Sequence, residues 1–289
     1  NNHRIFGEKQ GVVSSYLDEL NEAQKEAVLQ KEGPMIIIAG AGSGKTRVLT
    51  YRIAHLMKNG IDPFNILSLT FTNKAAKEMK SRIAGVVGPS EAKNLWMGTF
   101  HSVFARILRS EADKLGYPSN FTIYDTQDSV RLISSIIKEL QLEKDKYKPK
   151  QVLGRISQFK NSLITVRAYY QNPEVMEADK VSGRPKIGSI YKEYVDRCFK
   201  AGAMDFDDLL LRTNELHTRC PELLAKYQDR FRYIQVDENQ DTKQTQYLIV
   251  RALADRYHKI CEVGDDSKRI YHFIAAKNHT IQKIHKNNN

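Results

Sequence analysis

A glycine-rich loop at residues 39–46 has the residue types that bind a phosphate group. It follows the apolar run MIIIA (35–39) and precedes a segment in which Leu49, Ile53 and Leu56 recur at helical spacing. Small residues let the backbone wrap around an anion, so that several N–H groups point inward, and a helix N-terminus adds partial positive charge. The predicted phosphate-binding residues are Ala39, Gly40, Ala41, Gly42, Ser43, Gly44, Lys45 and Thr46.

The Lys-Thr pair that ends this loop indicates how the phosphates are held. In a strand–loop–helix P-loop, Lys45 contacts the β- and γ-phosphates of ATP, and the Thr46 hydroxyl ligates Mg²⁺. Ala39 stands where the strict pattern has glycine. A glycine-rich turn without a ligand is the alternative, but the flanking strand and helix favour an ATP–Mg²⁺ site.

Two consecutive acidic residues predict the other half of this site. The segment YIQVDENQDT (233–242) places Asp237 and Glu238 at the carboxyl end of a strand, where open α/β sheets bind their ligands. Asp237 is predicted to hold Mg²⁺ through water, and Glu238 to polarise the attacking water as a general base. Two acids after a strand often form a helix N-cap pair, but the P-loop favours the catalytic interpretation, with Lys45 as the third catalytic residue.

The elements that must position these residues alternate between strands and helices. Strands are predicted at 35–39, 65–71, 231–238 and 259–266, and helices at 20–30, 46–57 and 73–87. This alternation predicts an α/β fold with a parallel sheet that is covered by helices on both faces.

Residues 106–205 show a different pattern. Strand-like runs nearly vanish there, and helical periods dominate at 129–142, 148–163 and 186–202. The sequence separation of Lys45 and Asp237 is also far more than one or two crossover connections need. We therefore predict a core of residues 1–105 and 206–289, interrupted by a helical insert of residues 106–205.

The charge of the chain suits a polyanionic partner. Its net charge is +11 and its pI about 9.4, which fits nucleic acid, although a basic surface without a ligand is the alternative. Residues 144–167 carry seven basic residues and one acidic residue, with Tyr147 and Phe159 interleaved. This stretch is either a backbone-binding patch or a solvated face.

The composition also bears on the cellular location of the protein and on an alternative zinc site. No apolar run approaches the ~20 residues of a membrane span, so no membrane partner is expected. The three scattered cysteines fit a reducing compartment, and the predicted location is cytoplasmic. His217, Cys220, His258 and Cys261 have the spacing of a Cys₂His₂ zinc site, but Cys261 stands in an apolar strand run, which disfavours that interpretation.

Several short motifs follow one another in an order that chance does not explain. They are LNEAQ (20–24), AGAGSGKTRVL (39–49), LTFTNKAAKEM (69–79), GTFHS (98–102), MDFDDLLL (204–211), VDENQDT (236–242) and VGDDSKRIYHFIAA (263–276). On these motifs the chain resembles the N-terminal half of the superfamily 1 DNA helicases of the UvrD/Rep/PcrA type. The resemblance covers nearly the whole length.

This resemblance implies a RecA-like P-loop core with a helical insert, and ATP-driven 3′-to-5′ translocation on single-stranded DNA. It implies that Gln24 reads the base and that Arg47 belongs to the nucleotide site. It also implies that a second motor domain, outside this chain, completes the cleft. The DNA-binding residues implied by the motifs are Phe71, Thr72, Asn73, Thr99, His101, Tyr271 and Phe273.

Three departures from the family pattern bear on turnover. Lys268 stands where the family has a glutamine near the γ-phosphate, Ile274-Ala275 replace the usual arginine and glycine, and Asn239 replaces an aromatic residue. A lysine can only donate hydrogen bonds, so it cannot orient the attacking water as a glutamine does. We therefore weigh an ATPase motor module against a nucleotide- and DNA-binding module without turnover. The chain alone is predicted not to unwind DNA, a P-loop kinase is a less favoured third class, and no oligomeric state is indicated.

Overall fold

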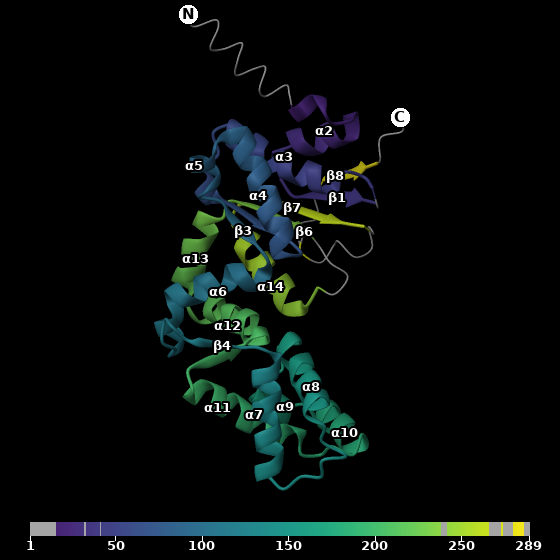
Figure 1. The fold of residues 1–289 in the computed structure, drawn as a ribbon, viewed down its shortest axis with the longest axis vertical. Helices are drawn as coiled ribbons and strands as arrows, with labels where there is room; N and C mark the ends of the chain where they lie inside the picture. The colour runs from purple at the N-terminus through teal and green to yellow at the C-terminus, as the bar shows by residue number, and fades with distance from the viewer. Residues whose placement is uncertain are drawn as a thin grey trace, which may run out of the picture. The chain divides into compact units, whose positions relative to one another are not determined.

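The computed structural model describes residues 16–31, 33–40, 42–237, 242–265, 273 and 280–285. The chain forms two compact units (Figure 1). The first comprises the chain up to Val103, Cys220–Thr242 and the chain from Val250 onward, and the second comprises Phe104–Arg219 and Lys243–Ile249.

A six-stranded sheet in the order β3-β2-β6-β7-β1-β8 forms the centre of the first unit. All of its paired strands are parallel. Its strands are β1 (Met35–Ala39), β2 (Ile66–Leu69), β3 (Trp96–Gly98), β6 (Tyr233–Asp237), β7 (Lys259–Gly264) and β8 (Thr280–Ile284). The inner strands are short apolar runs because helices cover both faces of a parallel sheet, and this confirms the predicted α/β class.

Helices of the first unit are held by caps and by apolar faces. They are α2 (Glu22–Leu29), α3 (Lys45–Lys58), α4 (Asn73–Val87), α5 (Pro89–Ala92) and α13 (Pro221–Arg230), with the one-turn η1 (Pro63–Asn65). The helix α3 buries Val48, Leu49 and Ile53 in the same core as the sheet residues Ile37 and Val263. Burial of this face fixes the direction in which α3 leaves the glycine-rich loop.

The second unit is mostly helical. Its helices are α7 (Thr126–Glu139), α8 (Pro149–Asn161), α9 (Val166–Tyr170), α10 (Pro173–Val181), α11 (Ile187–Lys200) and α12 (Phe206–Arg219), and a turn of 3₁₀ helix spans η2 (Ala112–Leu115). Helices α6 (Phe100–Glu111) and α14 (Gln244–Ala254) each contain a point where the chain passes from one unit to the other. A two-stranded parallel sheet pairs β4 (Thr122–Tyr124) with β5 (Ala203–Asp205), a feature that the sequence pattern did not predict.

The second unit is larger than the predicted insert of residues 106–205, because it also includes α12. Asp205 and Asp208 cap each other across the β5–α12 junction, with N–H to carboxylate distances of 2.8 and 3.0 Å. The buried Leu209 and Leu210 follow directly. The helix α12 is therefore continuous with the insert and does not belong to the core.

The two aromatic residues of the basic stretch 144–167 are core residues. Tyr147 and Phe159 are buried in the apolar core of the second unit, together with Ile156 and Tyr191. Neither ring is available to stack on a base. Among the described helices, none is long and apolar enough to cross a membrane.

Candidate functional site

The phosphate-binding loop connects the carboxyl end of β1 to the first turn of α3. Gly42 and Gly44 have φ angles of 72° and 78°, a left-handed conformation that favours glycine. Gly44 is the N-cap of α3 and offers no side chain to accept hydrogen bonds from the first-turn amides. These open N–H groups and the helix dipole form an anion site.

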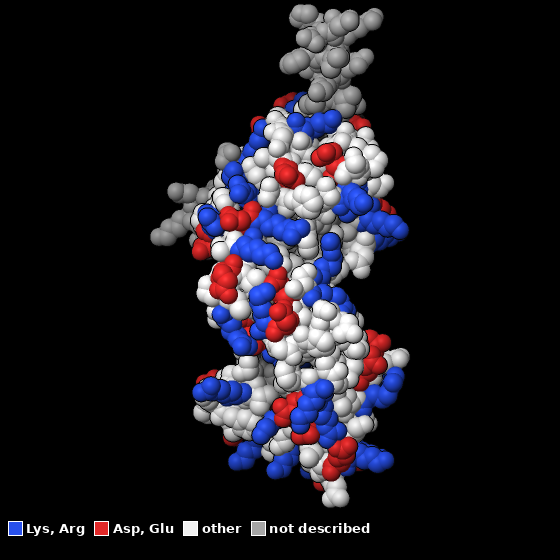
Figure 2. Space-filling model, turned by 90° about the vertical axis from the view of Figure 1, so that its left-hand side faces the viewer, with Lys and Arg blue, Asp and Glu red and all other residues white. Residues whose placement is uncertain are grey.

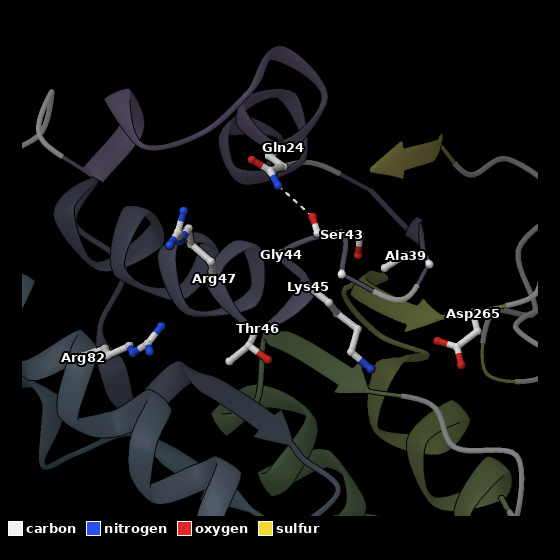
Figure 3. A pocket seen from close by; sticks show the side chains of 11 residues that line it. Gln24, Ala39, Ser43, Gly44, Lys45, Thr46, Arg47, Arg82 and Asp265 are labelled. Carbon is white, nitrogen blue, oxygen red and sulfur yellow. Dashed lines mark hydrogen bonds between the residues drawn. The ribbon is translucent and has the colours of Figure 1, made fainter. Parts of the chain in front are cut away.

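Gln24 braces this loop from α2. Asn21 and Gln24 form a reciprocal capping box at the start of α2, with both hydrogen bonds 2.9 Å long. The free end of the amide then donates from Nε2 to the Ser43 carbonyl at 2.7 Å (Figure 3). A Cβ atom at Gly44 would lie 2.7 Å from the same nitrogen, so only glycine fits there while Gln24 keeps its place.

Lys45 and Asp237 are brought together although β1 and β6 are not neighbours in the sheet. The Lys45 Nζ lies 3.0 Å from Asp237 Oδ1, and the two side chains are 27% and 14% exposed. Burial raises the pKa of the Asp237 carboxyl, Lys45 opposes this rise, and Asp265 adds to it. The pair therefore places a cation and a carboxyl oxygen side by side at the carboxyl end of the sheet.

The residues around the loop line a cavity of about 670 Å³. Its walls comprise Gln24, Ala39, Gly40, Gly42, Ser43, Gly44, Lys45, Thr46, Arg47, Arg82 and Asp265. In Figure 3, Arg47 and Arg82 lie to one side of the loop and Asp265 to the other. Arg82 and Asp265 were not predicted as site residues, although the position of Asp265 just after β7 is a signal that could have identified it.

The residues present fit a nucleoside triphosphate with Mg²⁺. The buried Ser43 hydroxyl has no hydrogen-bond partner in the described structure, and the first-turn amides of α3 have no side-chain cap. Thr46 and Asp237 offer the oxygen donors that Mg²⁺ prefers. Within the described ranges, no group of three or more His, Cys, Asp or Glu side chains lies together as a metal cluster.

The predicted DNA-binding residues around β2 and β3 lie at one edge of the sheet. Phe71, Thr72 and Asn73 follow β2, while Thr99 and His101 follow β3, and these two parallel strands are paired. The Phe71 side chain is 44% exposed. Both threonines are also helix caps: Thr72 Oγ1 accepts from the Ala75 amide at 3.0 Å, and Thr99 Oγ1 accepts from Ser102 at 3.3 Å.

Phe273 does not have the exposure predicted for a DNA-stacking aromatic. Its side chain is 1% exposed and stacks on Phe100, with ring centroids 6.4 Å apart. Apolar packing holds it, so it is a core residue in this structure. Ala41, Glu238, Lys268 and Tyr271, which were also predicted as site residues, lie outside the described residues, as do Asn239, Ile274 and Ala275.

Comparison with known proteins adds an independent finding. The family model described as UvrD/REP helicase N-terminal domain matches residues 20–289. An ATP-dependent DNA helicase PcrA of Bacillus subtilis is 44% identical over 92% of this chain and 35% of its own length. Proteins of the same name from Staphylococcus epidermidis and Staphylococcus aureus are 43% and 41% identical over 91% and 95% of this chain. The chain spans about a third of the length of these relatives, 35% to 37%.

Proposed function

The chain belongs to the UvrD/REP helicase N-terminal domain family, and on this premise we propose that it is the ATP- and DNA-binding part of an ATP-dependent DNA helicase. The observation that carries the proposal is the 3.0 Å pair of Lys45 and Asp237 beside an open helix N-terminus. The relatives named as ATP-dependent DNA helicases support the same activity for the whole protein.

In this proposal, physical roles fall to the loop residues, to Gln24 and to Asp237, which pairs with Lys45. The loop amides and Lys45 hold the phosphates, and Gln24 keeps the loop in shape while its amide faces the cavity. Thr46 and Asp237 hold Mg²⁺, which neutralises phosphate charge and polarises the transferred group. Glu238, next to Asp237 in sequence, orients the attacking water.

The proposed DNA path runs over the residues that follow β2 and β3. The path follows β2 and β3, and the nucleotide cavity lies around the ends of β1 and β7, so both lie at the carboxyl edge of one sheet. We propose 3′-to-5′ movement and a second motor domain in the remaining part of the protein. That domain would supply the missing wall of the cleft and the groups for efficient turnover.

Steady-state ATP hydrolysis tests this proposal against the alternative, a binding module without turnover. The chain alone should bind a fluorescent ATP analogue but hydrolyse little ATP. Completed by the second motor half of the Bacillus subtilis relative, it should hydrolyse ATP faster when single-stranded DNA is present. Nucleotide binding without DNA-stimulated hydrolysis in the completed protein would establish the binding module instead, and Lys268 would be the first residue to exchange for glutamine.

Phe71→Ala should weaken binding of single-stranded DNA by about 1–3 kcal/mol, because one exposed ring stops stacking on a base. Fluorescence anisotropy with a short oligothymidylate measures this loss. Phe199→Ala is the matched control, since Phe199 is 46% exposed but lies in the second unit. An unchanged affinity in the Phe71 variant would remove this residue from the proposed path.

A further inference from the structure

The amino edge of the same sheet carries a second group of basic and aromatic side chains. Parallel strands place the segments that precede β2, β3, β6 and β7 together at this edge, away from the phosphate-binding loop. We call it the amino-edge surface. It comprises the cations Arg230, Arg232, Arg256 and Lys259 and the rings of Phe64 and Tyr257, with the buried rings of Trp96 and Tyr233 beneath them.

The cations of this surface rest on aromatic rings. The Arg230 guanidinium carbon lies 4.7 Å from the Trp96 ring centroid and 5.7 Å from that of Phe64. The Arg232 guanidinium carbon lies 4.9 Å from the Tyr257 ring centroid. The Lys259 Nζ lies 4.7 Å from the Tyr233 ring centroid. Such contacts hold a cation in place without neutralising its charge.

Hydrogen bonds fix the backbone beneath these cations. Asn65 Nδ2 donates to the Arg230 carbonyl at 2.9 Å, which ties η1 to the end of α13. Tyr257 donates its hydroxyl proton to Asp229 Oδ1 at 2.7 Å, and Arg232 Nε donates to the Asp229 carbonyl at 3.1 Å. The rings and the guanidinium groups are therefore presented by a rigid set of turns.

The positive charge of this surface is only partly compensated. Asp229 pairs with Arg256 at 3.2 Å. Within the part of the chain that the structure describes, Arg230, Arg232 and Lys259 have no carboxylate within ion-pair distance. Figure 2 looks onto the side of the molecule where α13 lies in Figure 1, and shows Lys and Arg side chains interspersed with Asp and Glu and with uncharged surface.

We infer that the amino-edge surface is a second binding site for single-stranded nucleic acid, separate from the proposed motor path. Fixed cations without carboxylate partners suit phosphates, and Phe64, 44% exposed beside Arg230, offers a face on which a base can stack. An acidic peptide would use the same cations but has no need of an exposed ring. Phe64 and Phe71 flank the two ends of β2, so the two sites share one strand.

Photocrosslinking of the whole chain with a thiothymidine oligomer of about eight nucleotides tests this inference. At low salt, crosslinks should map both to peptides around Phe71 and to peptides of the amino-edge surface. Arg230→Gln/Arg232→Gln/Lys259→Gln should lower the amino-edge crosslinks about tenfold. The same triple change should reduce the salt slope of that site by about 2, since each lost phosphate contact contributes ~0.7. Crosslinks around Phe71 should stay unchanged.

Further variants in this experiment test the amino-edge site separately from the proposed motor path. Phe71→Ala should leave the amino-edge crosslinks intact, and Phe64→Ala should leave the crosslinks around Phe71 intact. The control Lys138→Gln/Lys192→Gln/Lys200→Gln removes the same charge from exposed positions of the second unit. If this control lowers the amino-edge crosslinks as much as the triple change does, the effect is one of net charge and the proposed site is overturned. Absence of amino-edge crosslinks in the unaltered chain would also overturn it, as would displacement by polyglutamate with no effect of Phe64→Ala. An oligouridylate arm distinguishes RNA from DNA.

Discussion

Lys45→Ala is expected to weaken binding of ATP with Mg²⁺ by roughly 30- to 140-fold. A hydrogen bond to a charged phosphate contributes about 2–3 kcal/mol, and each 1.4 kcal/mol is about tenfold in affinity. Lys45 is the one lysine among the described residues that line the cavity, and Arg47 and Arg82 lie on the opposite side of the loop from Asp265 (Figure 3).

The same substitution should disturb the metal half of the site. Asp237 is 14% exposed, and without its 3.0 Å partner the burial that already raises its pKa is no longer opposed by Lys45. Titration calorimetry of the nucleotide, with and without Mg²⁺, measures both effects. Lys58→Ala, at the other end of α3, is the control, and equal nucleotide affinity in wild type and Lys45→Ala would refute the assignment.

Much of the first unit could be predicted because its signals are local. The run MIIIA and the helix 73–87 have the predicted bounds, since an unbroken apolar run marks a buried strand and a helical period marks α4. β4 and β5 were missed because each is only three residues long and pairs with a segment far away in the chain. A strand of three residues is too short to show an alternating or continuous apolar pattern, and its pairing with a distant segment cannot be seen in one sequence.

The site was predictable where chemistry follows a strand end. Lys45 and Asp237 were predicted to converge, and their side chains lie 3.0 Å apart. Arg82 could not be identified, because an arginine on an amphipathic helix gives no signal of a cavity. Phe273 shows the opposite error, because sequence alone does not tell an exposed ring from one that is 1% exposed.

A buried ion cluster in the second unit is the basis of the second prediction, which concerns the stability of the fold. Lys160 is 1% exposed, and its Nζ lies 2.8 Å from Asp205 Oδ2 and 2.9 Å from Asp208 Oδ1. Tyr194 donates to Asp205 at 2.8 Å and contacts Ser129 at 2.9 Å. The cluster therefore joins α7, α8, α11, β5 and α12.

Asp208 is the member of the cluster that is poised to take up a proton. Burial and the neighbouring Asp205 carboxylate raise the pKa of Asp208 to about 6, from an ordinary 3.8. Although burial also acts on Asp205, Lys160 and Tyr194 hold the pKa of that carboxyl below its ordinary value. The stability linked to Asp208 is thus fully present below about pH 3.8 and is lost as pH rises through about 6.

Lys160→Met is expected to destabilise the chain by about 3–5 kcal/mol near pH 7.5, because two buried carboxylates lose their cation. Without Lys160 the pKa values of both carboxyls rise, so protonation relieves the repulsion and the destabilisation should shrink by about pH 5. Urea unfolding followed by circular dichroism at both pH values measures this. Lys150→Met, at an exposed position on α8, is the matched control and should change little.

Combining Lys160→Met with Asp205→Asn and Asp208→Asn separates charge from packing. Removing all three charges should recover much of the lost stability, because the cost lies in uncompensated buried carboxylates and not in the methylene chain of Lys160. If the triple variant is as unstable as Lys160→Met at both pH values, shape rather than charge holds these five elements together. If Lys160→Met lowers the free energy of unfolding by less than about 1 kcal/mol, the range of an exposed ion pair, then Lys160 does not stabilise the fold through its buried ion pairs.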